Sequence, residues 1–306
     1  MVNLSERFSF YKPRRGEWPG QSVSSEEMLE NLKRCEKLLE TENPRFHYLF
    51  DQPCLPGRER YSYILRMIFF LNGTFSMTAA YDRKIVERTL HAGEIAVGGR
   101  GNWNAPVTGE NHLNENYSVI FSHNLIRLVH SFPEADGRCH TIYCHYPPPG
   151  EQLRKLLDCA NEVIADINNV RSKRIRLLLE AILEQFKLDI ADNAPSVQQV
   201  PEIVSRAVHY IDLNYAMNIN CSSVADALQA NRTQLSELFH KSLNITMKDY
   251  ILNLRLEKAS WMLEYPDRKI TDIAQECGFA SAGYFIKVFR KKYHTTPQAY
   301  RTERVK

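Results

Sequence analysis

The sequence has 306 residues, of which 43% are hydrophobic, and a formal net charge of +3 at pH 7, so its length predicts two domains rather than one globule. Its first residues hold no apolar segment of the secretion-signal kind, and no stretch of about eighteen apolar residues occurs, so we expect a soluble, cytoplasmic protein without membrane contact. The seven cysteines form no Cys-x-x-Cys pair, which argues against zinc or thiol-redox motifs and predicts reduced thiols.

The residues before Pro147 have the pattern of one helix followed by a sheet. Ser24 or Ser25 can cap a helix over EEMLENLKRCEKLLE, whose leucines fall near one face. Between Tyr61 and Tyr146, short runs such as KIVERTL and EIAVGG are separated by Asn-Gly, Ala-Gly and Gly-Gly pairs. These runs predict a compact sheet domain, which we place at residues 1–150.

Two amphipathic helices are expected after the stop at Pro147-Pro148-Pro149-Gly150. Apolar residues recur at helical spacing from Leu153 to Ile167 and again from Ile175 to Phe186. Residues 151–192 therefore predict a helical connector, which can pack on the sheet alone or also on its copy in a second chain. The polar, proline-bearing stretch after it predicts a linker at residues 193–200.

Residues 201–306 are helical in pattern and repeat themselves. Val224-Ala225 recurs as Ile273-Ala274 at an offset of 49 residues, and Phe239 recurs as Phe289 at an offset of 50. The second copy therefore has one extra residue between its two helices. Each copy has the pattern of a helix-turn-helix unit.

The second copy shows the parts of such a unit most clearly. Thr271 can cap its first helix, and Gly278 can take the positive φ of a tight turn. The next helix is expected from Ala282 to Lys292. Its core is expected to consist of Phe279, Phe285 and Phe289.

Residues 203–301 resemble the AraC/XylS family of transcription regulators. The resemblance rests on KITDIAQECGFASAGYFIKVFRKKYHTTPQAYR and, in the copy before it, on QLSELFHKSLNITMKDYILNLRLEKASWML. It implies an all-α DNA-binding domain with two helix-turn-helix units over residues 201–306. Where family members usually have glycine, this chain has Gln229 in the first turn, and Asn244 and His294 after the second helices. Asn and His tolerate left-handed backbone better than most residues, so the fold is not in doubt.

Charge and spacing agree with DNA as the partner. From Pro201 onward 15 Lys and Arg residues face 11 Asp and Glu residues, and Ser281 to Lys306 holds seven bases and one acid. Such a cluster favours a polyanion, with a solvated surface as the alternative. A helix from about Met247 to Leu263 would separate the units by roughly 25 Å, against about 34 Å between successive major-groove faces. One chain can thus occupy two neighbouring grooves, with some DNA bending.

The resemblance also implies which side chains meet double-stranded DNA. Base-edge contacts fall to Thr233, Ser236 and Glu237 in the first copy and to Ala282, Gly283 and Lys287 in the second. Glu237, where the family often has arginine, can accept from a cytosine amino group, and Lys287 can donate to guanine. Phosphate contacts are expected from Arg232, Lys241, Arg290, Lys291 and Thr296. Exposed positions without a role in binding are the alternative. We expect the first copy to supply most base readout and the second most of the grip.

The segment TLHAGEIAVGGRGNW resembles the family's effector-binding half, a cupin-type β-barrel, with Gly93 in a turn between strands. The fold class is thus expected to be α+β, with an N-terminal cupin-like barrel, flanking helices and a C-terminal tandem helix-turn-helix. Candidates for lining a small-molecule pocket are Tyr63, Arg66, Tyr81, His91 and Trp103. Core packing is the alternative role for each of them.

An enzyme is not expected, because a catalytic cupin needs a metal cluster and no His-x-His pair occurs. The nearest metal candidate is RCHTIYCH, which contains Cys139, His140, Cys144 and His145. On a strand these side chains alternate between two faces, so chelation by all four needs a break in the strand. We therefore expect no metal, no cofactor and no catalytic residues.

The sequence thus predicts a sequence-specific transcription regulator controlled by a small-molecule effector. By resemblance, such proteins are commonly activators that contact RNA polymerase, respond to a sugar or other metabolite, and act as homodimers. The alternative is a cupin enzyme or metal sensor that carries the helical DNA-binding domain as an accessory.

Overall fold

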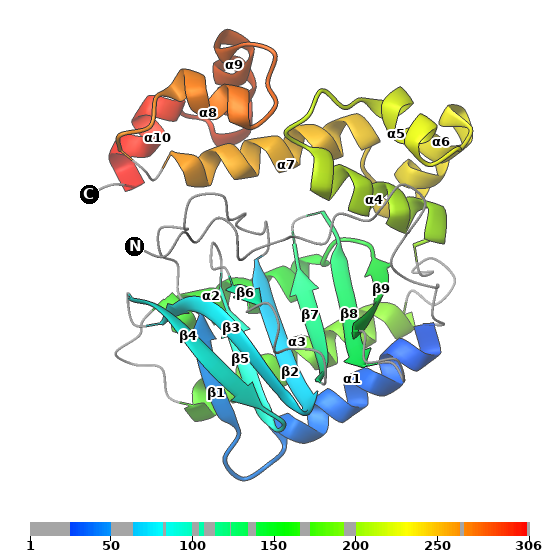
Figure 1. The fold of residues 1–306 in the computed structure, drawn as a ribbon, viewed down its shortest axis with the longest axis vertical. Coiled ribbons are helices and arrows are strands. Elements are labelled where there is room, and N and C mark those ends of the chain that lie inside the picture. The colour runs from blue at the N-terminus through cyan, green and yellow to red at the C-terminus, as the bar shows by residue number, and fades with distance from the viewer. Residues whose placement is uncertain are drawn as a thin grey trace. The chain divides into compact units, whose positions relative to one another are not determined.

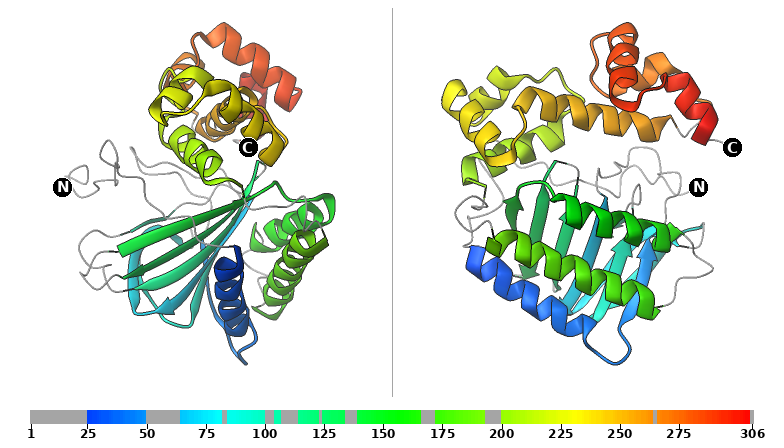
Figure 2. Two further views of the ribbon diagram at one scale, coloured as in Figure 1. Left: turned by 90° about the vertical axis from the view of Figure 1, so that its right-hand side faces the viewer. Right: turned by 180° about the vertical axis from the view of Figure 1, so that it is seen from behind.

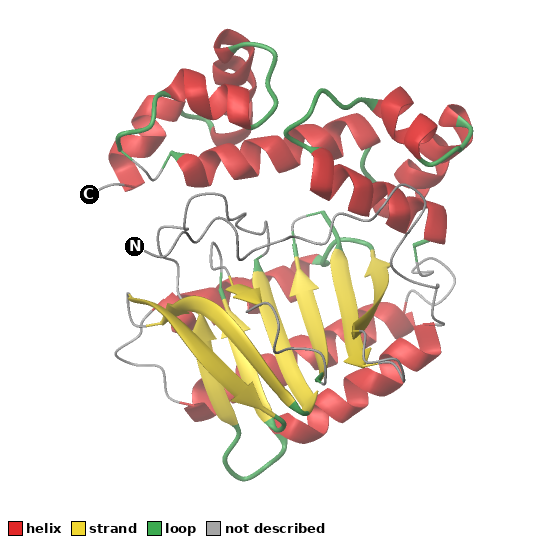
Figure 3. Cartoon of the chain, viewed as in Figure 1, coloured by secondary structure: helices red, strands yellow, loops and turns green. Residues whose placement is uncertain are grey.

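The computed structural model describes residues 25–49, 64–81, 84–99, 104–106, 114–122, 124–133, 139–165, 172–192, 200–263 and 266–304. The chain divides into two compact units, Met1–Val200 and Pro201–Lys306. The first combines sheets with helices, and the described part of the second is helical, which confirms the α+β class with a helical C-terminal unit (Figures 1 and 3). No helix in the described ranges is long and apolar enough to cross a membrane.

The N-terminal unit is built on two sheets. The larger has the strand order β1-β5-β2-β7-β8-β9, and the smaller has the order β4-β3-β6. The strands are β1 (Arg45–Leu49), β2 (Leu65–Asn72), β3 (Thr74–Tyr81), β4 (Lys84–His91), β5 (Glu94–Gly98), β6 (Asn104–Pro106), β7 (Glu115–Phe121), β8 (Ile126–Pro133) and β9 (Cys139–Tyr146). Only β1 and β5 pair in parallel among the described strands.

The two sheets face each other through an apolar cluster. Ile68, Phe70 and Ala96 of the larger sheet pack there with Met77 and Leu90 of the smaller one. Among the described residues no strand pairing joins the two sheets, so the expected closed barrel of the cupin type is not confirmed. Alternation of short β runs indicates a sheet, but closure depends on pairing between distant edges, which the local pattern does not specify.

Three helices cover the other face of the larger sheet, as Figure 2 shows. They are α1 (Ser25–Leu39), α2 (Glu151–Ala165) and α3 (Ser172–Asp192). Their apolar stripes meet the sheet in the main core, where the ring of Phe186 packs edge to face against Phe121 and Tyr146. The helices expected from the periodicity are confirmed, and both connector helices pack on the sheet of their own chain. On α3, however, Leu177 and Leu188 stay 54% and 46% exposed.

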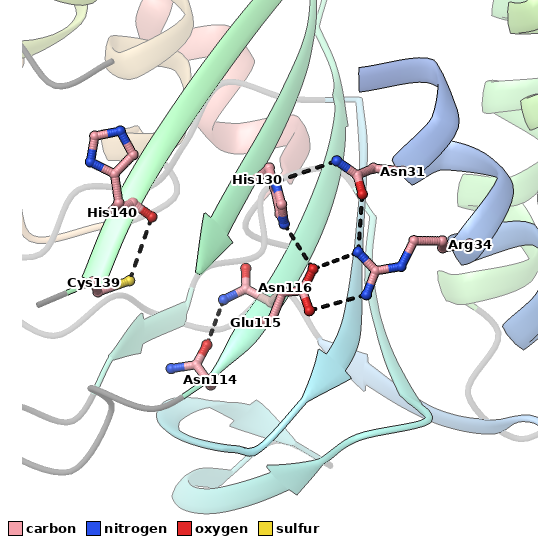
Figure 4. Close-up of polar contacts among 8 residues, drawn as sticks. All are labelled: Asn31, Arg34, Asn114, Glu115, Asn116, His130, Cys139 and His140. Atoms are coloured by element: carbon pink, nitrogen blue, oxygen red, sulfur yellow. Dashed lines mark hydrogen bonds and ion pairs between the residues drawn. The ribbon is translucent and has the colours of Figure 1, made fainter. Parts of the chain in front are cut away.

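A polar network ties α1 to β7 and β8 (Figure 4). Arg34 donates from its two Nη atoms to Glu115 Oε1 and Oε2 at 2.6 and 3.0 Å. Glu115 Oε1 also lies 3.0 Å from Nε2 of the buried His130. Asn31 completes the ring, because its Oδ1 accepts from Arg34 at 3.0 Å and its Nδ2 lies 3.4 Å from His130 Nδ1. Glu115 is therefore the centre of the attachment of α1.

Replacing Glu115 with glutamine should weaken this attachment in a pH-dependent way. The hydrogen bonds from Arg34, followed by that from His130, lower the pKa of Glu115 from its usual 4.5, so the ionised carboxylate stabilises the folded state. That stabilisation is complete above the unfolded pKa and is lost as the pH falls through the lowered value. We expect E115Q to reduce the free energy of unfolding by about 1 kcal/mol at neutral pH. The loss should shrink below about pH 4. Urea titrations at both pH values measure it, and an equal loss at both would contradict a role for the charge.

The C-terminal unit consists of seven helices within its described residues. They are α4 (Glu202–Asn214), α5 (Cys221–Ala227), α6 (Arg232–Leu243), α7 (Met247–Met262), α8 (Ile270–Glu276), α9 (Ala282–Tyr293) and α10 (Pro297–Arg304). The start of α8 follows that of α5 by 49 residues, and the start of α9 follows that of α6 by 50. The tandem repeat and its one-residue insertion are therefore confirmed.

The core of the second copy is aromatic. Phe279, Phe285 and Phe289 are buried together with Ile273 and Ala274, as expected. The rings of Phe285 and Phe289 lie 5.4 Å apart in an edge-to-face contact, and Phe289 also meets the ring of Tyr300 at 5.4 Å. This packing sets the angle at which α9 leaves the core.

The first helix of the second copy begins earlier than expected. Helix α8 starts at Ile270, its N-cap residue is Lys269, and no side chain provides a cap hydrogen bond. Thr271 lies inside the first turn, where its Oγ1 donates to Asp272 Oδ1 at 3.1 Å. The expected cap at Thr271 is therefore wrong. Ile270 packs against the apolar cluster of the second copy, which brings the residue before Thr271 into the helix.

Candidate nucleic-acid interface

Helix α6 is held between two defined ends. The side chain of Asn231 caps its N-terminus by accepting from the backbone nitrogens of Thr233 and Gln234 at 3.0 and 3.1 Å. Asn244 ends it in the left-handed conformation with φ +52°, as the departure from glycine predicted. Leu235, Phe239 and Leu243 bury one face. The opposite face leaves Arg232, Thr233, Glu237 and Lys241 exposed and Ser236 half-buried.

Helix α9 is built on the same plan. Ser281 Oγ caps it by accepting from the backbone nitrogen of Tyr284 at 3.2 Å, and His294 ends it with φ +59°. Phe285 and Phe289 form its buried face. Four predicted contact residues lie exposed on its outer side, namely Gly283, Lys287, Arg290 and Lys291. Ala282, also predicted as a base contact, is half-buried and packs against the apolar cluster on the side of Phe285 and Phe289.

The turns before α6 and α9 match residue by residue up to one point. The backbone nitrogens of Gln229 and Ala230 bond to Asp226 O and Ala225 O, and those of Gly278 and Phe279 bond to Gln275 O and Ala274 O. Gln229 and Gly278 both have positive φ, +53° and +79°. The insertion of the second copy therefore lies after Phe279, at the approach to the cap of α9.

Gly278 also lies where there is no room for a side chain. A Cβ at this position would lie 2.8 Å from the carbonyl oxygens of both Tyr215 and Ala216, in the loop that follows α4. Arg255 of α7 holds the same loop, because its Nε donates to Tyr215 O and its Nη2 to Met217 O, both at 2.8 Å. The turn of the second helix-turn-helix copy thus packs directly against the backbone of the loop that follows α4, within the C-terminal unit.

Some basic side chains near the C-terminus form hydrogen bonds within the C-terminal unit. Arg301 donates to Leu263 O, Pro266 O and Arg268 O at 3.2, 3.3 and 2.7 Å, beyond the end of α7. Lys292 Nζ donates to Asn253 Oδ1 at 3.1 Å. Thr296, a predicted phosphate contact, is half-buried and its Oγ1 accepts from the backbone nitrogen of Ala299 at 3.2 Å as the cap of α10. The basic side chains that remain on the exposed face of α9 are Lys287, Arg290 and Lys291.

Sequence reasoning missed the exposed apolar side chains of the two outer helices. Tyr284 and Ile286 on α9 are 45% and 38% exposed, and Leu238 on α6 is 38% exposed. The 50-residue offset makes Ile286 the counterpart of Ser236, which was itself singled out as a base contact. That correspondence was the signal that could have identified Ile286.

The pocket candidates are only partly within the described residues. Tyr63 and Trp103 lie outside them, as does the side chain of Tyr81. Arg66 is half-buried on β2, within the larger sheet, and pairs in the ladder with Gly98 and Ile120. His91 lies at the end of β4 with its side chain 63% exposed, 3.7 Å from Glu94.

The four residues of the metal candidate lie on β9, which is a continuous strand paired with β8 from Cys139 to Tyr146. Cys144 faces the helix side, where burial raises the pKa of its thiol to about 11. His145 Nε2 accepts from Arg127 Nε at 2.9 Å. The described residues contain no group of three or more His, Cys, Asp or Glu side chains placed to hold a metal ion.

Three comparisons describe what this chain is similar to. Residues 224–303 match the model of a family described as a helix-turn-helix domain. The Msm operon regulatory protein of Streptococcus mutans is 26% identical over 166 residues, which are 53% of this chain and 59% of that protein. An uncharacterized HTH-type transcriptional regulator of Escherichia coli, YijO, is 27% identical over 246 residues, 78% of this chain and 81% of its own.

Among solved structures, a transcriptional regulator with an AraC-type DNA-binding domain from Chromobacterium violaceum is 28% identical. It covers 34% of this chain and 93% of its own, with a TM-score of 0.32. The chain spans less than two thirds of the Streptococcus mutans relative. Both of the sequence relatives described align over more residues than the C-terminal unit contains, so the similarity extends into the N-terminal unit.

Proposed function

We propose that the chain is a DNA-binding transcription regulator of the AraC/XylS family and that it binds an operator with α6 and α9 in successive major grooves. The observation that carries this proposal is the repeated unit itself. Two helices of twelve residues, each capped by a polar side chain and each ended by a left-handed residue, present polar and basic faces to solvent. Helix α7 connects them, with a spacing suited to neighbouring grooves.

The base-reading residues we propose are Thr233, Ser236 and Glu237 on α6 and Ala282, Gly283 and Lys287 on α9. Thr233, Glu237, Gly283 and Lys287 are exposed and Ser236 is half-buried on the outer face of α6, which supports their assignment. Ala282 packs against the apolar cluster of the second copy, so its assignment rests on the resemblance alone. Glu237 is exposed and can accept from a cytosine amino group, and Lys287 can donate to guanine O6 or N7. Base readout by hydrogen bonds is thus concentrated in the first helix-turn-helix copy.

The phosphate contacts we propose are Arg232, Lys241, Arg290, Lys291 and Thr296. The first four are exposed, and three of them, Lys241, Arg290 and Lys291, lie in the last turn of their helix. The hydroxyl of Thr296 already caps α10, so its part is limited to adding a hydrogen bond through a remaining lone pair or its proton.

Within the N-terminal unit, residues 1–192 are proposed to receive a small-molecule effector such as a sugar or another metabolite. The sheet face opposite the helices supports a polar ligand, because its side chains alternate with those of the main core. They include Arg66, Asn116, Ser118, Arg127, Thr141 and His145. A metabolite that stabilises the full chain against heat would confirm this role by mass action.

The rival proposal is a cupin enzyme or metal sensor with an accessory DNA-binding domain. Metal analysis of the purified full chain separates the two. Stoichiometric metal in the N-terminal unit would favour the rival and would argue against a pocket for an organic ligand. A pocket that responds to metabolites and holds no stoichiometric metal favours the effector proposal.

We also propose a homodimer that activates transcription through RNA polymerase. Exposed Leu177 and Leu188 are eleven residues apart on α3, so three helical turns place them on one face, where a second copy of α3 can cover them. Sedimentation equilibrium of the full chain should report two chains per particle. A monomer at micromolar concentration would contradict the dimer and leave the DNA-binding proposal standing.

Protection mapping on DNA tests the main proposal. The full chain should protect about two helical turns on one face of a selected promoter fragment. Its affinity should fall steeply as salt concentration rises, because each neutralised phosphate releases counterions. An unrelated fragment of equal length is the control. Equal, diffuse protection of both fragments would mean that the chain binds DNA only through charge.

A further inference from the structure

We infer that Ile286 recognises a thymine methyl group, so that α9 adds base selectivity through an apolar contact. The inference rests on the proposed DNA binding by α9 and goes beyond it. It concerns a residue that hydrogen-bond chemistry alone would pass over.

The position of Ile286 on α9 is the first argument. Gly283, Ile286, Lys287 and Arg290 have the spacing i, i+3, i+4 and i+7, which places them on one side of a helix. All four are exposed, whereas Phe285 lies on the buried side. Ile286 therefore shares the face that carries the basic side chains of the helix.

The burial pattern is the second argument. The apolar cluster of the second unit takes in Ala282, Val288 and Tyr293 from α9, but within the described residues it does not include Ile286. Tyr284, the other exposed apolar residue of α9, has its ring 6.4 Å from that of Phe279, so core contact accounts for part of its position. Ile286 is β-branched and only a moderate helix former, so helix propensity does not account for it, and with 38% of its surface exposed packing accounts for it only in part.

The chemistry of the groove is the third argument. The thymine methyl is an apolar feature of the major groove that an aliphatic side chain can contact, and cytosine lacks it. At Gly283 a built Cβ would meet no atom within 4 Å, so nothing blocks a close approach at the start of α9. Lys287 and Arg290 supply charge on the same face for the surrounding phosphates. Ile286, on the same face, would displace water from the methyl group.

A thymine contact by Ile286 changes what each helix-turn-helix copy is expected to contribute to DNA recognition. Ala282 and Gly283 have little hydrogen-bonding capacity, which by itself favours a second unit that only grips the backbone. With Ile286 on the same face, the second unit also selects thymine at one or two positions.

Replacing thymine by uracil, one position at a time, tests the inference because it removes only the methyl group. The probe is a duplex recovered with the full chain from a random-sequence pool, and every thymine of the protected site is replaced in turn. Wild-type protein should lose roughly three- to five-fold in affinity at one or two positions. At those positions I286A should show less than about a 1.5-fold effect of uracil, since the contact is already absent.

Two further variants sharpen the result. I286V keeps two methyl groups and should retain most of the uracil effect. L238A removes an apolar side chain with the same 38% exposure from α6 and should respond to uracil as the wild type does. The inference would be overturned if no uracil substitution lowered the affinity of the wild type, or if I286A lost as much affinity to uracil as the wild type does. Specific binding of the selected duplex would in both cases still support the proposed function. If the wild type bound no duplex specifically, both the inference and the proposed function would be overturned.

Discussion

Replacing Gly278 with alanine should destabilise the C-terminal unit by about 2–4 kcal/mol. Two costs add at this residue. Its φ of +79° is a conformation that residues with a Cβ adopt at a penalty, and the new Cβ would lie 2.8 Å from two backbone carbonyl oxygens. Those oxygens belong to Tyr215 and Ala216, which Arg255 helps to hold, so the loop cannot yield as a flexible side chain would.

Two matched controls change Gly283 in α9 and the equivalent turn residue of the first copy, Gln229. G283A adds a Cβ that meets no atom within 4 Å in a helix, and should stabilise the unit by about 0.5–1 kcal/mol. Q229G places glycine at the equivalent turn of the first copy, where φ is +53°, and should be neutral or stabilising by up to about 1 kcal/mol.

Urea unfolding of the full chain, followed by hydrogen exchange at α8 and α9, measures all three variants. G278A should accelerate exchange in these helices and in the loop after α4. A G278A protein as stable as the wild type would mean that the turn of the second unit does not sit against that loop.

The second large effect concerns Lys287 and Lys291, one helical turn apart on α9. We expect K287A to relax preference at one base pair at a cost of about 1–3 kcal/mol, because the role proposed for this lysine is to donate to a guanine edge. K291A should weaken binding to all sequences alike and reduce the salt slope by about one, as expected for a phosphate contact. Titrations of matched operator variants at several salt concentrations measure both quantities.

The two lysines serve as controls for each other, since each variant removes one exposed positive charge from the same helix. Identical behaviour of both variants would mean that both contact only the backbone. The reverse assignment would mean that α9 enters the groove with a different face. In either case the proposed base contacts of the second unit would have to be reassigned.

Much of the C-terminal unit could be predicted because its signals are local. The spacing of Ile273, Ala274, Phe285 and Phe289 identified two helices and their buried sides, and the structure confirms both. Asn244 and His294 were expected to tolerate left-handed backbone, and both adopt it. Thr271 shows the limit of such local signals. Two possible first residues of a helix that are one or two positions apart cannot be ranked from the sequence without knowing which side chain packs in the core.

The binding face was less predictable than the fold. Assignment by resemblance selected polar, basic and small residues as contacts. It omitted Ile286, since a large apolar residue in a helix is ordinarily taken for core. Arg301 illustrates the converse. It belongs to a basic cluster that favours DNA, yet its guanidinium is engaged by three carbonyl groups beyond the end of α7.

The sequence by itself determined the tandem unit, its register and the insertion in the second turn, because helix periodicity, capping residues and turn residues act over a few positions. Only the tertiary structure decided how the N-terminal strands are ordered, that α1 is tied by Arg34 to Glu115, and that Gly278 sits against the loop after α4. Each of these joins residues far apart in the chain. Their contact depends on how whole elements pack, and no local pattern carries that information.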